Sequence, residues 1–387
     1  MKINTNLVPL PSPPIPLFLG HWASPWRDAD YDEIHLDADV PLAHRKFFYA
    51  SGDINFLRES WPLLEGSCLF WQCRFTRTDS SGPPPSEYPT GCSAKNGVGN
   101  WTVKHVITPD ESSGIVDDSA YTNAAAASTL SWCIEAGLIL NISTPQLWAT
   151  IASSPFLQLN ASLTPAGPVH AQQTGYSGKQ INQADVALLY YPLNMDFGHE
   201  QNQRDLDYYA ARTDFSGMFT GDSAYSCAYL ELGNRSAADE QLNSAFGHLS
   251  QDFNVFTETE ITGSAPPVTS GTQHFITGSG GLLQAFLFGY PGLRIQRLGV
   301  LSFTAQRPLL PPLGITQVKL RGLHLLNFII DVGYTESLFC AQLQVHNDDL
   351  SGVEIRVIAD NSRFNITVEK EVCVGVQALE IAGVGYI

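Results

Sequence analysis

The chain has 387 residues, of which 44% are hydrophobic and 15% are charged, and its formal net charge is -17. This composition excludes an intrinsically disordered chain, and the length is typical of two domains. The acidity argues against nucleic acid or an anionic membrane surface as a partner, because both would repel the chain. We expect a neutral ligand such as a small carbohydrate, or an acidic working environment; the composition leaves the oligomeric state open.

The cysteine pattern gives no sign of a metal centre. The chain has no CxxC pair and no paired Cys/His spacing, so the sequence predicts no zinc site. Most of the thiols are interpreted as buried or unpaired, and an odd number leaves at least one free thiol even in a secreted protein. The seven cysteines are Cys68, Cys73, Cys92, Cys133, Cys227, Cys340 and Cys373.

Glycosylation sequons bear on the compartment. Their number is roughly twice what random placement would give, which indicates a secretory route, extracellular or vacuolar. Against this, the apolar stretch from Pro9 to Gly20 is broken by prolines and is a poor signal peptide, so a cytoplasmic location stays open. No segment is long and apolar enough to span a bilayer. The five sequons begin at Asn100, Asn141, Asn160, Asn234 and Asn365.

The first half of the chain shows helical periodicity after an irregular, Pro-rich lead-in over residues 1–32. Apolar residues recur at helical spacing over 33–49 and 53–74, and Ser51-Gly52-Asp53 supplies a helix stop and an N-cap between them. Residues 77–100 are rich in Pro and Gly and are predicted to be a loop. The helix expected over 118–137 can be capped by Asp117, Asp118 or Ser119.

Further helices are predicted up to residue 289, and paired helices with short turns predict an α/α toroid or bundle. The Gly-rich stretch Thr277–Gly281 is interpreted as a tight helix entry. It lacks the G-x-G-x-x-G pattern and the lysine of a phosphate-binding loop. The other predicted helical segments are 144–153, an apolar run over 184–191, 200–212, 222–232, 236–250 and 282–289, with a loop over 154–182.

The periodicity changes at Pro291, after which short β-branched or alternating segments are separated by turn residues. This pattern predicts a small antiparallel β-sandwich. We therefore expect a mainly α fold with a β module, in which residues 33–292 form a helical catalytic-type domain and 293–387 a sheet domain. The predicted strands cover 293–296, 300–305, 317–320, 323–330, 338–345, 353–359, 364–370 and 376–381.

Two separated carboxylates are the strongest candidates for chemistry. Hydrolysis of an acetal needs one protonated carboxyl to release the leaving oxygen and one ionised carboxylate to activate water. Glu111, after Pro109-Asp110 at a loop-to-helix junction, is the candidate acid, although these residues are also typical of an ordinary helix start. Glu258 is the candidate base, with a solvated charged loop as the alternative. The two lie 147 positions apart (258 − 111), so they meet only if the helices close into a ring.

Other chemistry fits less well. Asp222-Ser223 and Ser226 have no suitably placed histidine in the sequence, and no G-x-S-x-G elbow is present, so a serine hydrolase is disfavoured. Tryptophans could stack on sugar rings, but those at helical spacing are interpreted as core. These are Trp61, Trp71 and Trp132; Trp101 stays a candidate for stacking.

Several segments, in this order, resemble glycoside hydrolase family 65, in particular its hydrolytic branch of acid trehalases and the glucosidase of collagen-type glucosylgalactosyl-hydroxylysine. No single segment is decisive, but five in the right order are specific, and they cover residues 33 to about 300. The matching segments are 33–39 (EIHLDAD), 109–111 (PDE) with 121–123 (YTN), 183–189 (QADVALL) with Tyr191-Pro192, 256–258 (FTE) and 275–284 (FITGSGGLLQ).

The resemblance implies an (α/α)6 barrel and inverting hydrolysis of an α-glucosidic bond, with α,α-trehalose the leading substrate and no cofactor or metal. Glu111 then matches the family's general acid and Glu258 the general base of its hydrolases. Substrate-binding roles are implied for Asn182, Gln183, Tyr121 and Asn123.

The chain departs from the family in ways that keep two alternatives open. It begins after the family's N-terminal β domain and early barrel helices, so we expect an incomplete toroid. The family's Lys-Gln pair is here Asn182-Gln183, and its aromatic-His after the acid is Ser112-Ser113. One alternative is therefore a catalytically impaired carbohydrate-binding paralogue or fragment. The other is a disaccharide phosphorylase, but Thr269-Ser270-Gly271 lacks the histidine of the family's phosphate motif.

Overall fold

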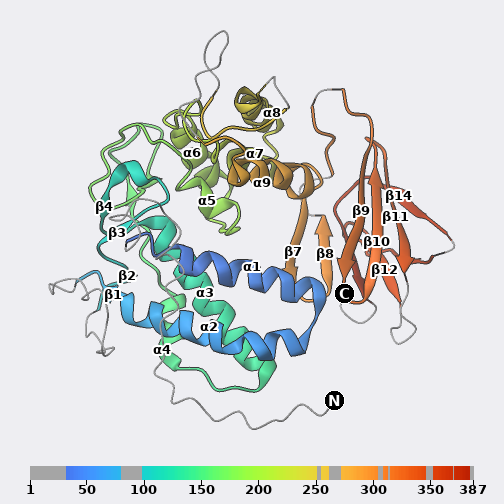
Figure 1. The fold of residues 1–387 in the computed structure, drawn as a ribbon, viewed down its shortest axis with the longest axis horizontal. Helices are drawn as coiled ribbons and strands as arrows, with labels where there is room; N and C mark the ends of the chain where they lie inside the picture. The colour runs from blue at the N-terminus through green and yellow to red at the C-terminus, as the bar shows by residue number, and fades with distance from the viewer. Residues whose placement is uncertain are drawn as a thin grey trace.

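The computed structural model describes residues 32–79, 98–250, 254–260, 272–303, 308–312, 314–345, 352–368 and 370–383. Within these ranges all the α-helices precede the two large sheets (Figure 1). The predicted lead-in up to residue 31, most of the predicted loop over 77–100 and the Thr269–Gly271 segment lie outside the described residues.

The first helical group is a hairpin followed by a long buried helix. Gly52 ends the first helix in the left-handed region at φ 64°, and the Asp53 carboxylate accepts the backbone N–H groups of Asn55 and Phe56. The predicted stop and cap are thus confirmed. At the third helix Ser119 is the cap, its hydroxyl accepting from Thr122 N. The helices are α1 (Leu36–Ser51), α2 (Ile54–Arg74), α3 (Ala120–Leu140) and α4 (Gln146–Ala152).

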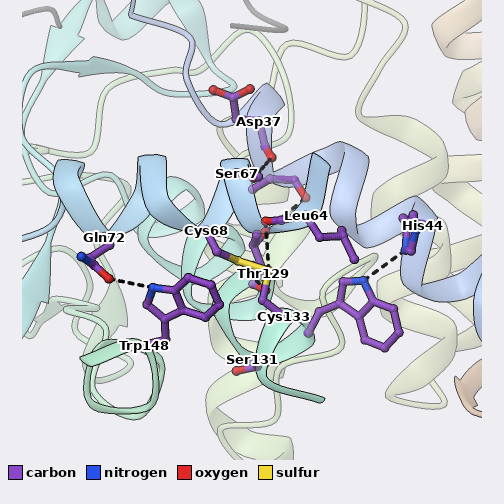
Figure 2. The surroundings of a disulfide bond; sticks show 12 residues. Asp37, His44, Leu64, Ser67, Cys68, Gln72, Thr129, Ser131, Cys133 and Trp148 are labelled. Carbon is purple, nitrogen blue, oxygen red and sulfur yellow. Dashed lines mark hydrogen bonds between the residues drawn. A yellow bond between two sulfur atoms is a disulfide. The ribbon is translucent and has the colours of Figure 1, made fainter. Parts of the chain in front are cut away.

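A buried disulfide between Cys68 and Cys133 joins α2 to α3 (Figure 2). Cys340 and Cys373 form a second disulfide between neighbouring strands, and Cys73 is disulfide-bonded too. The interpretation of most cysteines as unpaired was therefore wrong. The reason is physical: the partners in the first bridge are 65 positions apart in sequence and meet only through helix packing. Among the described cysteines only Cys227 is free, and it is buried.

The second helical group packs around α7, which contacts α8 on one side and α9 with the turn that follows it on another. In Figure 1 this group lies above α1, and α5 lies between the two helical groups. Its members are α5 (Ala187–Tyr190), α6 (His199–Ala210), α7 (Asp222–Glu231), α8 (Arg235–Ala245), η3 (Phe246–His248), α9 (Ile276–Gln284) and the π turn η4 (Ala285–Gly289).

The Gly-rich stretch is part of α9 and not an entry to it. The helix begins at Ile276, six residues before the predicted start at Leu282. Gly278 permits close packing at this point, because a Cβ there would lie 2.0 Å from a ring carbon of Phe219 and 2.4 Å from its carbonyl oxygen. The glycines therefore serve helix packing, a requirement that the local sequence pattern does not show.

Three two-residue antiparallel pairs occur in segments that were predicted to be loop or were not assigned. Such short strands leave no periodic pattern, so the sequence could not reveal them. The pair β3 and β4 brackets the 3-10 turn η2 (Glu111–Ser113) and closes a tight loop. The pairs are β1 (Thr76–Arg77) with β2 (Trp101–Thr102), β3 (Val106–Ile107) with β4 (Ile115–Val116), and β5 (Leu159–Asn160) with β6 (Val169–His170).

Two antiparallel sheets follow, in the orders β14-β11-β10-β9 and β13-β12-β15-β8-β7. Their inner faces share one apolar core, in which the rings of Phe303 and Phe339 meet edge-to-face with centroids 4.8 Å apart. The strands are β7 (Leu293–Arg297), β8 (Val300–Phe303), β9 (Val318–Leu325), β10 (Phe328–Tyr334), β11 (Leu338–Val345), β12 (Val353–Val357), β13 (Arg363–Ile366), β14 (Val372–Gly375) and β15 (Leu379–Gly383).

The strand predictions were wrong in two places. The predicted segment 323–330 spans a turn, since Leu326 has φ 55° and separates β9 from β10. Strand β14 was missed, and β15 begins three residues after the predicted start at Val376. Apolar runs continue through these turns, so periodicity alone cannot mark the breaks.

The molecule has two apolar cores, one among the helices and one between the sheets. Phe288 and Ile295 pack against both, where η4 gives way to β7. Within the described part of the chain, no helix has both the length and the apolar character required to cross a bilayer.

Candidate active site

Glu111 stands at the first position of η2, on the loop that β3 and β4 close. Its side chain is exposed, whereas the preceding Asp110 is fully buried. The loop therefore turns the Asp110 carboxyl inward and the Glu111 carboxyl outward, so the two adjacent acidic residues have different environments.

Asp110 ties the loop to the protein behind it. Its Oδ1 accepts from Asn182 N at 3.0 Å and from the Ser112 hydroxyl at 2.7 Å. Its Oδ2 accepts from Gln172 Nε2 at 3.1 Å and from the Ser113 hydroxyl at 3.2 Å. Ser112 and Ser113, which depart from the family pattern, thus help to satisfy this buried carboxylate.

Asp185 also holds this loop in place. It is fully buried, and its Oδ2 accepts the Thr108 hydroxyl and, at 3.4 Å, the Asp110 backbone N–H. Its Oδ1 has no hydrogen-bond partner. Burial raises the pKa of Asp185 to about 7, with the nearby Asp110 charge adding to the rise. A group with such a pKa holds its proton through mildly acidic pH.

Glu258 is held by the backbone of two other segments. Its carbonyl oxygen accepts from Phe219 N at 2.7 Å, and its N–H donates to Thr272 O at 2.9 Å. Its carboxylate Oε2 accepts from Thr272 N at 2.7 Å. The side chain is half-buried, so one oxygen is anchored while the group keeps access to solvent.

The negative charge of Glu258 acts on the Glu111 carboxyl. The pKa of Glu111 is raised, first by partial loss of hydration and then by the negative charges of Asp110 and Glu258. Although the Glu111 side chain is largely exposed, both neighbouring charges act in the same direction as its partial burial. A raised pKa is what a proton donor needs, and the anionic neighbour that helps to raise it is the candidate base.

Of the four expected substrate-binding residues, only Asn182 presents an exposed side chain. Gln183 is buried, with Nε2 donating to Pro109 O and Oε1 accepting from the Thr220 hydroxyl at 2.8 Å. Its amide therefore helps to hold the loop that carries Glu111. Contact of Gln183 with a substrate remains a prediction.

Tyr121 and Asn123 also have structural roles. The buried Tyr121 hydroxyl donates to Asp39 at 2.7 Å. The Asn123 amide accepts from Val103 N at 2.8 Å and donates to the Thr102 hydroxyl at 3.0 Å and to Phe156 O at 2.9 Å. These groups are buried and engaged with protein groups, and contact of either residue with a substrate remains a prediction.

Sequence reasoning missed three residues at this site. Gln172 gave no signal, since it lies in a predicted loop. Asp185 could have been noticed as a single charge in an apolar run. Lys179, whose ammonium lies 3.5 Å from the Ser112 carbonyl, brings an exposed positive charge to the acid loop, where the family's lysine is replaced by Asn182.

Trp101 is not a sugar platform. It is 5% exposed, and the Arg77 guanidinium covers its ring at 3.8 Å from the centroid. The other three tryptophans expected in the core, Trp61, Trp71 and Trp132, are buried as predicted.

A third buried acid, Asp222, lies in the first turn of α7. Asp222 is fully buried and neither oxygen has a regular hydrogen-bond partner. Burial raises its pKa to about 6, and Ser244, close by but outside regular hydrogen-bond geometry, is the first of the groups that oppose the rise. The Ser223 and Ser226 hydroxyls have no hydrogen-bond partner. These serines are not hydrogen-bonded to a histidine in the described structure.

A separate hollow of about 330 Å³ lies away from this loop, at the C-terminal end of α7. The Glu258 segment meets the chain at Phe219, just before the N-terminal end of the same helix. A helix of ten residues separates the two ends by about 15 Å. The hollow is lined mainly by polar side chains, including Asn194, Asp196, His199, Asn202, Glu231 and Gln296.

Comparison with known proteins gives relatives of one kind. A protein-glucosylgalactosylhydroxylysine glucosidase of Dictyostelium discoideum is 30% identical over 338 residues, which cover 86% of this chain and 43% of that protein. A kojibiose hydrolase of Mucilaginibacter mallensis is 30% identical over 76% of this chain and 39% of its own length. The chain is homologous to the glycoside hydrolases of family 65. A cell wall acid trehalase of Arthroderma benhamiae is 32% identical over 73% of this chain and 25% of its own length.

The chain thus spans less than half the length of these family 65 relatives. A solved structure titled as a putative kojibiose phosphorylase from the human microbiome superposes with a TM-score of 0.62 over 88% of this chain and 49% of that one. At 12% identity this likeness shows a shared fold, a helical domain followed by an antiparallel sheet domain. No family model matches the chain.

Proposed function

We propose that this chain carries the acid–base centre of an inverting α-glucoside hydrolase, with Glu111 as general acid and Glu258 as general base. One observation carries the proposal: carboxyls from segments 147 positions apart (258 − 111) lie close enough that the Glu258 charge contributes to the raised pKa of Glu111. The helical domain is proposed to be part of an (α/α)6 toroid.

The reaction follows from the two protonation states. Protonated Glu111 donates its proton to the glycosidic oxygen as the C1–O bond breaks, while ionised Glu258 takes a proton from the water whose oxygen bonds to C1. Water attacks from the face opposite the leaving group, so an α-glucoside gives β-glucose first. Asp110 and Asp185 hold the donor loop, and exposed Asn182 and Lys179 are the side chains placed to contact a sugar.

The substrate is proposed from the relatives, whose names specify trehalose, kojibiose and glucosylgalactosyl-hydroxylysine. We take α,α-trehalose as the leading candidate and kojibiose as the comparison. All three are neutral at the scissile glucosyl unit, which suits a chain with a net charge of -17.

The decisive experiment measures glucose release and the anomer first formed, using the chain with Glu111→Gln and Glu258→Gln as variants. Each variant is expected to lose at least about 100-fold in turnover, the range typical of acid–base groups. Glu65→Gln, which alters an exposed glutamate on α2, is the matched control and should leave the rate unchanged. Equal activity of Glu111→Gln and wild type would contradict the assignment.

A second candidate is binding of a sugar without hydrolysis. It is favoured by the engagement of Glu258 Oε2 with Thr272 N and of Gln183 with the acid loop. Calorimetry that shows trehalose binding with no glucose release would support it. Glucose 1-phosphate released only with phosphate present would instead indicate a phosphorylase.

A further inference from the structure

The sequons of the chain lie in described segments, and those at Asn141, Asn160 and Asn365 adjoin exposed apolar side chains. Asn141 ends α3 in the left-handed region at φ 57°, with its side chain exposed. Leu138 and Ile139 in the last turn of this helix are 76% and 37% exposed. A patch of this kind at a helix end is a liability for a soluble protein unless something covers it.

The Asn365 sequon lies on the edge of a sheet. Asn365 is exposed on β13, the outer strand of the five-stranded sheet, and pairs with Glu354 on the inner side only. Phe364 and Val368 beside it are 40% and 45% exposed. An edge strand with exposed apolar residues can pair with the edge of another chain, and natural proteins usually block such edges.

The disulfides indicate the compartment independently of these sequons. Cys68–Cys133 and Cys340–Cys373 are formed, and Cys73 is also disulfide-bonded. Structural disulfides of this number form in oxidising compartments such as the secretory pathway. N-linked glycosylation takes place in the same compartment, so the cross-links and the sequons agree.

We propose that Asn141 and Asn365 carry N-linked glycans, which cover the α3 end and the β13 edge. The donor is an oligosaccharide linked through pyrophosphate to a lipid. A bond forms between the asparagine Nδ2 and sugar C1, the bond from C1 to pyrophosphate oxygen breaks, the lipid pyrophosphate leaves, and the amide proton passes to the transferase. This inference does not depend on the proposed hydrolysis.

The other three sequons are less accessible to modification. The side-chain Oδ1 of Asn160 accepts both the N–H and the hydroxyl of Ser162, its own sequon residue, and the Asn234 side chain caps α8 by accepting from Ala237 N. Thr102, which completes the Asn100 sequon, is fully buried and bonded to Asp118. Asn141 and Asn365, by contrast, have exposed side chains and sequon partners, Ser143 and Thr367, that are exposed as well.

The test uses the full chain secreted from a eukaryotic host, with disulfide formation checked by thiol titration. Peptide N-glycosidase should convert Asn141 and Asn365 to aspartate, a gain of about 1 Da at each site in peptide mass spectra. Unmodified asparagine at both sites, in secreted protein with its disulfides formed, overturns the proposal.

Matched variants separate glycosylation from folding. Ser143→Ala and Thr367→Ala each remove a sequon while keeping the asparagine, and in particular the left-handed cap at Asn141. Each should lose the mass of one glycan and aggregate several-fold faster on warming. The controls Ser143→Thr and Thr367→Ser keep the sequons and should match wild type. Alanine variants that lose the glycan yet stay as soluble as these controls would overturn the shielding role.

Discussion

Some buried carboxyls of the helical domain differ in their surroundings from those of the sheet domain. Asp110, Asp185 and Asp222 in the helical domain are fully buried; the first two accept from hydroxyl, amide and backbone N–H groups, and Asp222 has no regular hydrogen-bond partner. In the sheet domain, Glu354 pairs with Arg363 at 3.0 Å, and Glu380 pairs with Arg297 and Arg356 at 2.5 Å each. Burial raises the pKa of Asp185 and Asp222, whereas Glu354 and Glu380 lie against arginine side chains.

This difference supports the proposal that places the acid–base chemistry in the helical domain. Burial raises the pKa of Asp185 to about 7 and of Asp222 to about 6, and it contributes most to the raised pKa of Glu111. A desolvated carboxyl without a cationic partner favours its neutral form. The helical domain therefore accepts a cost in stability near neutral pH, as functional sites often do.

Removing a disulfide is the substitution expected to change the free energy of unfolding most in either domain. Removing the Cys68–Cys133 bridge by a double alanine substitution should lower the free energy of unfolding by about 4 kcal/mol, since it releases a loop of 65 positions. Removing Cys340–Cys373, which closes 33 positions, should cost somewhat less. Urea unfolding of both variants measures the difference.

Mild reduction provides a second measurement on the same bridges. Cys373 is exposed and both cysteines of the helical bridge are fully buried, so the sheet bridge should be reduced first. Alkylation followed by mass spectrometry reports the order. Earlier reduction of Cys68–Cys133 would contradict the burial of that bridge.

Asp185→Asn should flatten the pH dependence of stability. The folded pKa of about 7 lies above the ordinary value of 3.8 for an aspartate, so the folded state binds this proton more tightly. Wild type should therefore lose stability as pH rises from about 4 to about 7, by on the order of 4 kcal/mol in total. The asparagine variant lacks this loss. In urea unfolding, its free energy of unfolding minus that of wild type should therefore be more positive at pH 8 than at pH 5. Glu65→Gln is the control; parallel pH profiles for Asp185→Asn and wild type would show that Asp185 is not a proton-holding group.

Glu380→Gln tests the opposite arrangement in the sheet domain. The change leaves two arginines without their carboxylate partner and should cost about 2 kcal/mol of unfolding free energy. This is below the cost of breaking a fully buried pair, because Arg297 and Arg356 are 48% and 26% exposed. Glu336→Gln in an exposed turn is the control. If Glu380→Gln loses no more unfolding free energy than this control, water satisfies the two arginines as well as the carboxylate does.

The smallest effect separates packing from helix propensity in α9. Gly278→Ala should destabilise by about 1–3 kcal/mol, because the new methyl group meets the Phe219 ring and carbonyl. Gly280→Ala, where a Cβ has nothing within 4 Å, should stabilise by about 0.5–1 kcal/mol. Thermal melts of the two variants should therefore shift in opposite directions; shifts of the same sign would contradict the close contact at Phe219.

Local sequence determined the elements that have strong local signals. The limits of α1 and α2 follow from Gly52 and Asp53, which stop one helix and cap the next. The change in hydrophobic periodicity after Pro291 predicted the sheet domain. Glu111 and Glu258 could be chosen as candidates by residue type and resemblance. In each case the information lies within a few residues, because capping and periodicity are local properties of the backbone.

Only the tertiary structure decided which distant residues meet. It paired Cys68 with Cys133, placed Gly278 against Phe219, and buried the side chains of Gln183, Tyr121 and Asn123 against neighbouring protein groups. It also showed that Asp110 and Asp185 tie the Glu111 loop to the rest of the protein. Burial and hydrogen bonding depend on the whole packed chain, and so do the proton affinities of its carboxyls.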